Sequence, residues 1–316
     1  MKIAVLDWST MCCGNDISPD IFRKFGDLSV FPLTSPEDTA DAIGNAEIVL
    51  CNKVPITRPV IDKCPNLRYI GLFATGYNNV DIRYASEKGI TVCNAGQYST
   101  NAVAQQVFAY ILDYCNRIRE YDSLVHGGKW ESSPCFSYFP IPTSEIYGKT
   151  LSIVGYGSIG KRTAEIGNAF GMKIIVNTRT APTNCQYETA DLKTTAQKAD
   201  FLTFHCPLTE QTKGIVNSGL LAEMKSTAVL INTSRGAVVN EPDLADALNS
   251  GKIAGAYLDV LEKEPMSSDT PLKTARNCII TPHTAWASYE TRMSLLKIVA
   301  DNIRSWINGS PKNKVN

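Results

Sequence analysis

Short apolar segments alternate with helical patterns over the first hundred residues. Ser35 followed by Pro36 indicates a helix start, because a serine side chain caps free N–H groups and proline suits the first turn. Gly44 is expected to end that helix, and Gly89 the next helix at 81–88. The strand-length apolar runs lie at 3–6, 48–51, 69–73 and 90–93. This alternation predicts a parallel sheet with crossover helices.

A longer helix is expected to begin near Thr100. Its apolar positions recur at helical spacing and predict a single buried face; they are Val103, Val107, Ile111, Tyr114 and Ile118. The stretch at 130–147 is irregular and rich in aromatic residues and proline. It could be a linker, an active-site loop or an oligomer arm, and composition does not choose among them.

From residue 150 the alternation begins again. The six strand candidates lie at 151–154, 173–177, 201–205, 228–232, 254–259 and 278–281. Six parallel strands joined by helices match the strand count of a complete Rossmann unit. After His283 a last helix is expected to run to about Ile307, with Gly309 ending it.

Composition narrows the class of protein. A chain of 316 residues with 44% hydrophobic residues suits two domains that each bury a core. Lysine plus arginine balance aspartate plus glutamate at 31 each, which argues against binding to nucleic acid or a membrane surface. The chain has no bilayer-length apolar run and no signal-peptide pattern at its start, and its ten cysteines lack metal-ligand spacing. We therefore expect a cytoplasmic protein with reduced cysteines and no metal site.

A glycine motif follows the apolar strand that opens the second half. Gly155, Gly157 and Gly160 have the G-x-G-x-x-G spacing of a dinucleotide-binding loop, with Ser158 and Ile159 between the last two glycines. Such glycines permit a tight turn, a close approach to pyrophosphate and close helix–strand packing. The helix that follows would present its N–H groups to the anion. The order of strand, loop, helix and strand predicts dinucleotide binding.

The end of the next strand lacks the acid that usually binds the ribose of NAD. An Asp or Glu is expected there, but this chain has Asn177, Thr178, Arg179 and Thr180. An arginine at this place suits the 2′-phosphate of NADP(H), which the sequence modestly favours. The alternative is that Arg179 is a solvated loop residue and that NAD(H) binds without the acid.

Three further segments carry candidate chemistry at the ends of predicted strands. Arg235 precedes Gly236, Glu264 precedes a proline, and His283 follows one. Open α/β sheets place ligands at these strand ends. Taken singly, the arginine could cap a strand, the glutamate could be surface charge and the histidine could stabilise a turn. Their joint placement after a phosphate loop favours a site.

Reduction of a 2-keto acid explains these three residue types. A guanidinium binds a carboxylate through two parallel hydrogen bonds, and histidine donates protons near neutral pH. A carboxylate beside the imidazole favours its charged form and fixes its orientation. Arg235, Glu264 and His283 are therefore the candidate catalytic residues.

Several motifs together resemble the D-isomer-specific 2-hydroxyacid dehydrogenase family over nearly the whole chain. Two further segments, at 135–140 and 283–288, resemble the glycerate dehydrogenases of that family, also called hydroxypyruvate reductases. The family motifs lie at 74–81, 155–160, 205–209, 232–236, 258–265 and 282–283.

The resemblance implies roles for particular residues. Arg235 would bind and polarise the substrate, Glu264 would support the acid, and His283 would be the proton donor. Asp259 would hold the nicotinamide carboxamide. Further cofactor contacts are expected at Cys206, Pro207 and Thr233, and substrate contacts at Ala74, Thr75, Gly76 and Trp286. Trp286 could instead be a packing residue at a helix start.

The resemblance also implies the domain plan. A Rossmann dinucleotide-binding domain at 99–284 would be inserted into a flavodoxin-like substrate domain formed by 1–98 and 285–316, and the cleft between them would close on substrate. A homodimer is expected, with Trp130 either in a dimer arm or covering the core.

These features predict an NAD(P)H-linked reductase of a small 2-keto acid, with hydroxypyruvate or glyoxylate as substrate. Another 2-keto acid remains an alternative, because one methylene changes binding by only about 1–3 kcal/mol. A second alternative is a dinucleotide-sensing interaction protein, similar to the family's transcriptional corepressors, because a fold does not fix a function.

Overall fold

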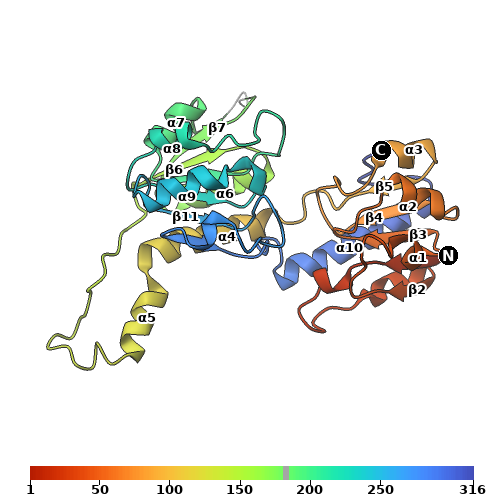
Figure 1. Cartoon of the computed structure of the whole chain (residues 1–316), viewed down its shortest axis with the longest axis horizontal. Coiled ribbons are helices and arrows are strands. Elements are labelled where there is room, and N and C mark those ends of the chain that lie inside the picture. The colour runs from red at the N-terminus through yellow and green to blue at the C-terminus, as the bar shows by residue number, and fades with distance from the viewer. Residues whose placement is uncertain (181–184) are drawn as a thin grey trace. The chain divides into compact units, whose positions relative to one another are not determined.

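The computed structural model describes residues 1–180 and 185–316, and its chain divides into two compact units (Figure 1). Unit 1 comprises Met1–Tyr98 and Ala287–Asn316, and unit 2 comprises Ser99–Trp286. Each unit is a parallel sheet with helices on both faces. The predicted fold class of two doubly wound α/β domains is confirmed.

The sheet of unit 1 has the strand order β2-β1-β3-β4-β5, with all pairs parallel. This is the order of the flavodoxin-like doubly wound fold. The edge strand β2 was not predicted, because its residues alternate between exposed and half-buried and form no apolar run. The strands are β1 (Lys2–Val5), β2 (Asp27–Val30), β3 (Ile48–Cys51), β4 (Tyr69–Leu72) and β5 (Thr91–Cys93).

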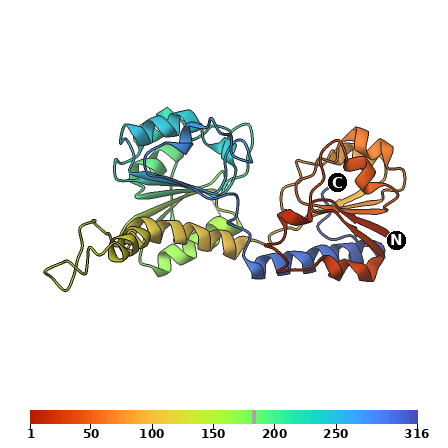
Figure 2. The same cartoon turned by 60° about the horizontal axis from the view of Figure 1, so that its bottom comes forward.

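Helices cover both faces of this sheet (Figure 2). One face packs against three short helices, and a buried apolar cluster lies between them and the strands. The other face packs against the long helix α10 and the 3₁₀ helix η2. The helices are α1 (Thr39–Ile43), α2 (Arg58–Lys63), α3 (Ile82–Glu87), α10 (Tyr289–Ile307), η1 (Trp8–Thr10) and η2 (Pro19–Phe25).

The start of α1 differs from the prediction. Ser35 Oγ does accept a hydrogen bond from the N–H of Asp38 at 3.2 Å, but 36–38 form a turn and the helix begins at Thr39. The serine therefore caps a turn rather than the helix. The predicted ends at Gly44 and Ile307 are confirmed.

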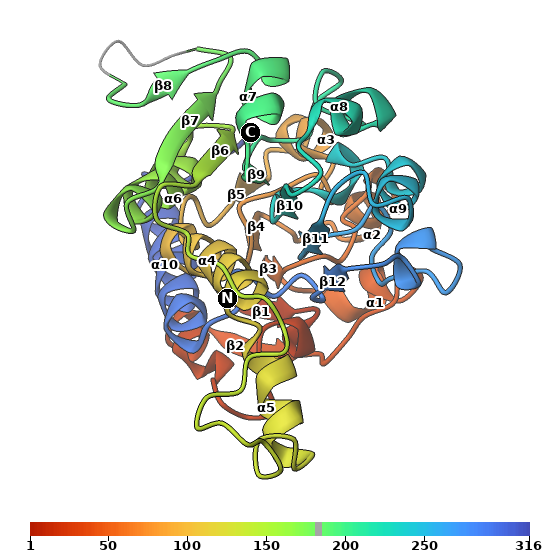
Figure 3. The same cartoon turned by 90° about the vertical axis from the view of Figure 1, so that its left-hand side faces the viewer.

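The sheet of unit 2 has the strand order β12-β11-β10-β9-β6-β7-β8 (Figure 3). From β8 to β11 this is the Rossmann arrangement, with β12 added beside β11. The prediction of six strands is wrong by one, because the two-residue β8 is too short to leave a pattern. The strands are β6 (Thr150–Val154), β7 (Lys173–Asn177), β8 (Glu188–Thr189), β9 (Phe201–Phe204), β10 (Val229–Asn232), β11 (Gly255–Leu258) and β12 (Cys278–Ile280).

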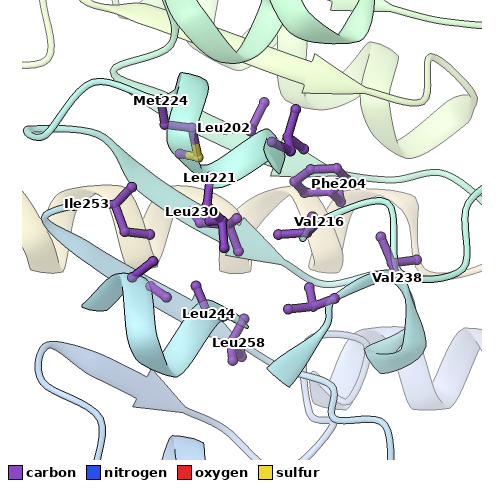
Figure 4. Close-up of a cluster of buried hydrophobic side chains, with 14 of the residues drawn as sticks. Leu202, Phe204, Val216, Leu221, Met224, Leu230, Val238, Leu244, Ile253 and Leu258 are labelled. Carbon is purple, nitrogen blue, oxygen red and sulfur yellow. The ribbon is translucent and has the colours of Figure 1, made fainter. Parts of the chain in front are cut away.

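Two buried apolar clusters hold the helices of unit 2 to its sheet. One joins the strands to α4 and α6, and the other joins them to α7, α8 and α9 (Figure 4). Because both faces are covered, most strands are continuous apolar runs, as the sequence pattern indicated. The helices are α4 (Thr100–Asn116), α6 (Ser158–Ala169), α7 (Leu192–Lys198), α8 (Ser218–Glu223), α9 (Glu241–Asn249), η3 (Gly236–Val238) and η4 (Pro271–Lys273).

The predicted continuation of α4 through Ile118 is wrong. Arg117 takes a left-handed conformation with φ 52°, which ends α4 at Asn116. Helix α5 (Ile118–His126) then leads away from the sheet of unit 2, and the residues at 127–147 return without a helix or strand (Figures 1 and 3). Ile118 is consequently 64% exposed.

The described residues also bear on the expectations for membrane-spanning helices and for cysteines. None of their helices has the length and apolar character needed to cross a membrane. All ten cysteines of the chain lie in the described ranges and carry free thiols.

Candidate active site

The glycine loop joins β6 to α6 and owes its shape to two close backbone contacts. Gly155 has φ 98°, and a Cβ on it would lie 2.5 Å from the backbone nitrogen of Cys206. A Cβ on Gly160 would lie 2.1 Å from the carbonyl oxygen of Gly155. Both distances are far below contact distance, so neither site accepts a side chain without backbone movement. Cys206 itself is buried, and the carbonyl of Pro207 accepts a hydrogen bond from Thr212.

Gly157 serves a different purpose from its neighbours. A Cβ on it would meet no described atom within 4 Å, and its φ of −80° is open to any residue. No described side chain caps the first turn of α6, which begins at Ser158. Space above the loop and uncapped N–H groups are what a pyrophosphate requires.

Two buried polar atoms support the same conclusion at the neighbouring strand ends. Within the described ranges, neither His205 Nδ1 after β9 nor Thr233 Oγ1 after β10 has a hydrogen-bond partner. Such groups are costly unless a ligand or water satisfies them. The residues around the glycine loop therefore fit a bound dinucleotide.

The three candidate residues at the end of β7 make different contacts. Asn177 Nδ2 donates to the carbonyl of Ala190 at 2.9 Å, so this amide ties β7 to the segment after β8. Thr178 makes a long hydrogen bond of 3.4 Å to the carbonyl of Thr180. Arg179 is exposed and forms no ion pair with a residue the structure describes. Its guanidinium is available to a ligand.

Asn232, the last residue of β10, shapes the loop that carries Arg235. Its Nδ2 donates to the carbonyl of Arg235 at 2.9 Å, and its Oδ1 accepts from the N–H of Ser234 at 3.0 Å. Arg235 Nη1 in turn donates to the carbonyl of Ser234 at 2.7 Å. The backbone is thus fixed while the guanidinium stays exposed.

The Arg235 loop lies directly against the loop that carries Glu264. A Cβ on Gly236 would lie 1.8 Å from the carbonyl carbon of Leu261 and 2.3 Å from the backbone nitrogen of Glu262. Glu241, at the start of α9, accepts from the Glu262 N–H at 2.8 Å and from a threonine hydroxyl. A buried carboxylate therefore holds the second loop in this contact.

Glu264 and His283 form the central hydrogen bond of the site. His283 Nδ1 lies 2.6 Å from Glu264 Oε2, while Glu264 Oε1 accepts from the N–H of Leu261 at 3.0 Å. His283 has φ 55° and donates its own N–H to the carbonyl of Asp259 at 2.8 Å. With Nδ1 engaged by the carboxylate, Nε2 is the nitrogen left for a substrate.

Asp259 anchors the segment on both sides of His283. Its carboxylate accepts from Thr281 Oγ1 at 2.5 Å and from the N–H groups of Thr284 and Ala285, each at 2.8 Å. Burial raises the pKa of Asp259, and the hydrogen bonds from Thr281, Ala285 and Thr284 oppose that rise. Tyr110 of α4 shares a further hydrogen bond with Thr281.

His205 and His126 are the other two histidines of the chain. Burial lowers the pKa of His205 to about 3, so this ring is neutral. His126 ends α5 and lies beside Asp122. His283 is the histidine that the structure places next to a candidate catalytic carboxylate.

The remaining predicted substrate residues belong to other segments. Ala74, Thr75 and Gly76 form the loop after β4 in unit 1, where Ala74 is buried and Thr75 is exposed. Trp286 is half-buried at the end of unit 2, before α10 begins at Tyr289.

Three residues that shape the site were not predicted. Asn232 lies inside the motif at 232–236, and Thr281 directly precedes the motif at 282–283. A polar residue at the end of a buried strand was the pattern that would have indicated both. Glu241 left no signal, because its role is to accept the N–H group of Glu262, which lies 21 residues away in the chain.

Comparison with known proteins identifies the family. Residues 108–285 match the NAD-binding domain of the D-isomer specific 2-hydroxyacid dehydrogenases. The chain is 42% identical, over the full length of both proteins, to a hydroxypyruvate reductase of Blautia hydrogenotrophica. The chain therefore belongs to the D-isomer specific 2-hydroxyacid dehydrogenase family and is an NAD(P)-dependent oxidoreductase, which confirms the resemblance.

Two solved structures resemble the whole chain. An acyclic imino acid reductase in complex with NADPH and D-Arg is 32% identical, with a TM-score of 0.87 and full coverage of both chains. An NADPH-dependent glyoxylate/hydroxypyruvate reductase from Sinorhizobium meliloti is 28% identical, with a TM-score of 0.84, covering 99% of this chain and 97% of that one. The nicotinamide dinucleotide is thus the cofactor of the site.

We predict that Gly157→Ala weakens cofactor binding without destabilising the protein. The added methyl group meets no atom of residues 1–180 or 185–316 within 4 Å but enters the space expected for the pyrophosphate. The dissociation constant for the reduced cofactor should rise about tenfold or more, while the melting temperature stays unchanged. Quenching of protein fluorescence and thermal unfolding measure the two quantities.

Gly160→Ala is the matched comparison. Its methyl group would collide with the Gly155 carbonyl, so the melting temperature should fall. Normal cofactor affinity in Gly157→Ala would place the phosphates elsewhere.

Proposed function

We propose that the protein reduces a small 2-keto acid, hydroxypyruvate or glyoxylate, with NAD(P)H, in the manner of a glycerate dehydrogenase. The hydrogen bond between His283 and Glu264 carries this proposal. It lies at the edge of the sheet where the loops after β10, β11 and β12 meet, and the loop after β10 also carries the exposed Arg235. Similarity to a hydroxypyruvate reductase along the full chain supports the substrate class.

The three side chains have complementary roles in this reaction. Arg235 binds and polarises the keto acid, since its guanidinium is exposed and its backbone is fixed by Asn232. When bound, the nicotinamide supplies a hydride. His283 donates a proton from Nε2 to the oxygen of the reduced carbonyl group. Glu264 stabilises the charged imidazole and fixes its orientation through Nδ1.

We assign cofactor binding to residues 99–284 and the substrate domain to 1–98 with 285–316. The glycine loop would hold the pyrophosphate, and Asp259 would accept a hydrogen bond from the carboxamide N–H of the nicotinamide. Asp259 Oδ2 accepts one backbone N–H, whereas Oδ1 accepts two donors, so Oδ2 has acceptor capacity left. The remaining proposed cofactor contacts are Ser158, Ile159, Asn177, Thr178, Cys206, Pro207 and Thr233.

NADP(H) is the cofactor form that the end of β7 favours. No carboxylate stands at 177–180, so nothing there would repel a 2′-phosphate. Arg179 is exposed and has no ion-pair partner among the described residues. A guanidinium in this position suits a phosphate monoester.

Catalysis should depend on His283. We predict that His283→Ala lowers kcat about a hundredfold or more and leaves the cofactor dissociation constant nearly unchanged. Glu264→Gln should lower kcat in the same direction, because the neutral amide stabilises the charged imidazole less. Loss of NAD(P)H absorbance with hydroxypyruvate, glyoxylate and pyruvate measures the rates.

Two substitutions serve as controls for this experiment. His126→Ala changes an exposed histidine on α5, and Glu262→Gln changes an exposed carboxylate two residues from Glu264. Both should retain normal turnover. Normal turnover in His283→Ala would remove it as the proton donor, and tight cofactor binding without turnover of any 2-keto acid would favour a dinucleotide-sensing interaction protein.

The cofactor preference gives a separate prediction. Wild-type enzyme should have the higher kcat/KM with NADPH, and Arg179→Gln should lower that value about tenfold while sparing NADH. Arg83→Gln, an exposed arginine of unit 1, is the control. A wild-type preference for NADH would leave the reductase in place and show that Arg179 binds no phosphate.

The segment from α5 to residue 147 is an arm that we propose pairs with a second copy of the chain. Its own hydrogen bonds, such as Trp130 Nε1 to the carbonyl of Phe136 at 2.9 Å, hold it together. Its large apolar side chains are nevertheless uncovered, with Phe136 95% and Phe139 78% exposed. Side chains of the arm also enclose a hollow of about 290 Å³ lined by Tyr121, Val125, Trp130, Phe136, Ser137 and Tyr138. An apolar surface of this kind marks an association site.

Light scattering tests this pairing. The wild-type protein should have twice the 34.6 kDa mass of one chain, and the double substitution Phe136→Ser with Phe139→Ser should yield monomers. Leu33→Ser, at a 69% exposed position of unit 1, should remain dimeric. A monomeric wild-type protein would contradict the proposal.

A further inference from the structure

The loop at 74–76 is held from one side by the segment that follows β5. The carbonyl of Ala74 accepts from the N–H of Ala95 at 2.9 Å. The carbonyl of Thr75 accepts from Asn94 Nδ2 at 2.8 Å. Because β4 and β5 are parallel neighbours, this segment lies beside the loop at the carboxyl edge of the sheet. Two consecutive carbonyl groups of the loop therefore point toward 94–96.

Peptide geometry then fixes where the N–H groups of the loop point. In a trans peptide the C=O and N–H bonds are antiparallel within one plane. The peptides after Ala74 and Thr75 are trans, so the N–H groups of Thr75 and Gly76 point away from 94–96. Neither N–H has a hydrogen-bond partner within 1–180 or 185–316. The loop thus directs two adjacent donors to the same side, as an anion site requires.

Asn94 is the centre of this arrangement, because each of its polar groups has a partner. Its backbone N–H donates to the carbonyl of Asn313 at 3.1 Å, and its carbonyl accepts from Asn302 Nδ2 at 2.8 Å. Its side-chain Oδ1 accepts from the N–H of Gly96 at 3.1 Å, and Nδ2 binds Thr75. The backbone is held on both sides, so the amide has one orientation.

The two asparagines behind Asn94 are themselves ordered. Asn302 on α10 is 2% exposed, and its Oδ1 accepts from Asn313 Nδ2 at 2.9 Å. Asn313 belongs to the segment after α10, which runs antiparallel beside β5. A buried amide whose donor and acceptor are both used is rigid, since any rotation would leave a polar group unsatisfied.

We propose that Asn94 is a positioning residue for the substrate carboxylate. By holding the Thr75 carbonyl, it sets the polarity of the Thr75–Gly76 peptide, and Asn302 and Asn313 hold Asn94 from behind. This inference rests on the proposed function and on the substrate contacts that the family resemblance implies for the loop at 74–76, whose N–H groups would meet the carboxylate of the keto acid. It adds Asn94 as the residue that orients the N–H groups of the loop toward the substrate.

Asn94→Asp is the decisive substitution. The new carboxylate has the same shape but only acceptor atoms, so it repels the Thr75 carbonyl and attracts an N–H. Glycine at 76 allows the peptide to turn over, which would present a carbonyl oxygen to the substrate. We expect KM for glyoxylate to rise about a hundredfold in Asn94→Asp but only about tenfold in Asn94→Ala, with the dissociation constant for NADPH unchanged in both.

If Asn94 had a purely structural role, the order of the KM effects of its two variants would be reversed. The isosteric aspartate would then be the milder change, and cofactor binding would weaken along with the fold. Asn66→Asp is the control, because Asn66 is an exposed asparagine of the same unit whose amide makes only a 3.5 Å contact with Asn45. It should leave KM unchanged. Equal KM values for Asn94→Asp and the wild type, or equal rises in both Asn94 variants, would overturn the proposal.

A crystal structure of Asn94→Asp separates this inference from the proposed function. The Thr75 carbonyl should point away from residue 94, and an unturned peptide would refute the inference whatever the activity. Failure of the wild-type protein to reduce any 2-keto acid would instead refute the proposed function, and the peptide orientation would still decide the role of Asn94.

Discussion

The site depends on one contact between two backbones. The loop after β10 lies against the loop after β11 so closely that a single methyl group on Gly236 would overlap the carbonyl carbon of Leu261, at 1.8 Å. This contact brings the exposed Arg235 beside the segment that carries Glu264. Because β12 lies next to β11 in the same parallel sheet, His283 then reaches Glu264 from the third loop. Strand order brings the loops to one edge, and glycine lets them touch.

Buried carboxylates keep these loops in place. Asp259 accepts the N–H groups of Thr284 and Ala285, and Asp7 of unit 1 accepts those of Asn52 and Lys53 at 2.8 and 2.7 Å. Burial raises the pKa of both Asp259 and Asp7, and hydrogen bonds to their carboxylates oppose that rise. Each acid follows a buried strand and accepts N–H groups from the loop after the neighbouring parallel strand. The same physical arrangement therefore holds loops at the carboxyl edge of both sheets.

The sequence predicted features that depend on local patterns. Strands buried on both faces leave continuous apolar runs, and the glycine loop has a fixed spacing, so both were identified. The half-exposed β2, the two-residue β8 and the left-handed Arg117 that ends α4 leave no such pattern. Their places at the ends of predicted strands singled out Arg235, Glu264 and His283, and the family resemblance gave them roles. Glu241 could not be found, because its partner Glu262 is close only after folding.

Rigidity at the His283–Glu264 pair follows from the backbone rather than from packing. Glu264 is held at Oε1 by the N–H of Leu261 and at Oε2 by the imidazole, so its carboxylate cannot rotate without losing one of two hydrogen bonds. His283 has a positive φ, and its N–H bond to the Asp259 carbonyl holds it there. Both side chains are partly exposed, at 27% and 35%, so burial does not immobilise them. The orientation of Nε2 is therefore set by the Asp259 and Leu261 backbones, and any change that moves these loops alters proton delivery before it alters the fold.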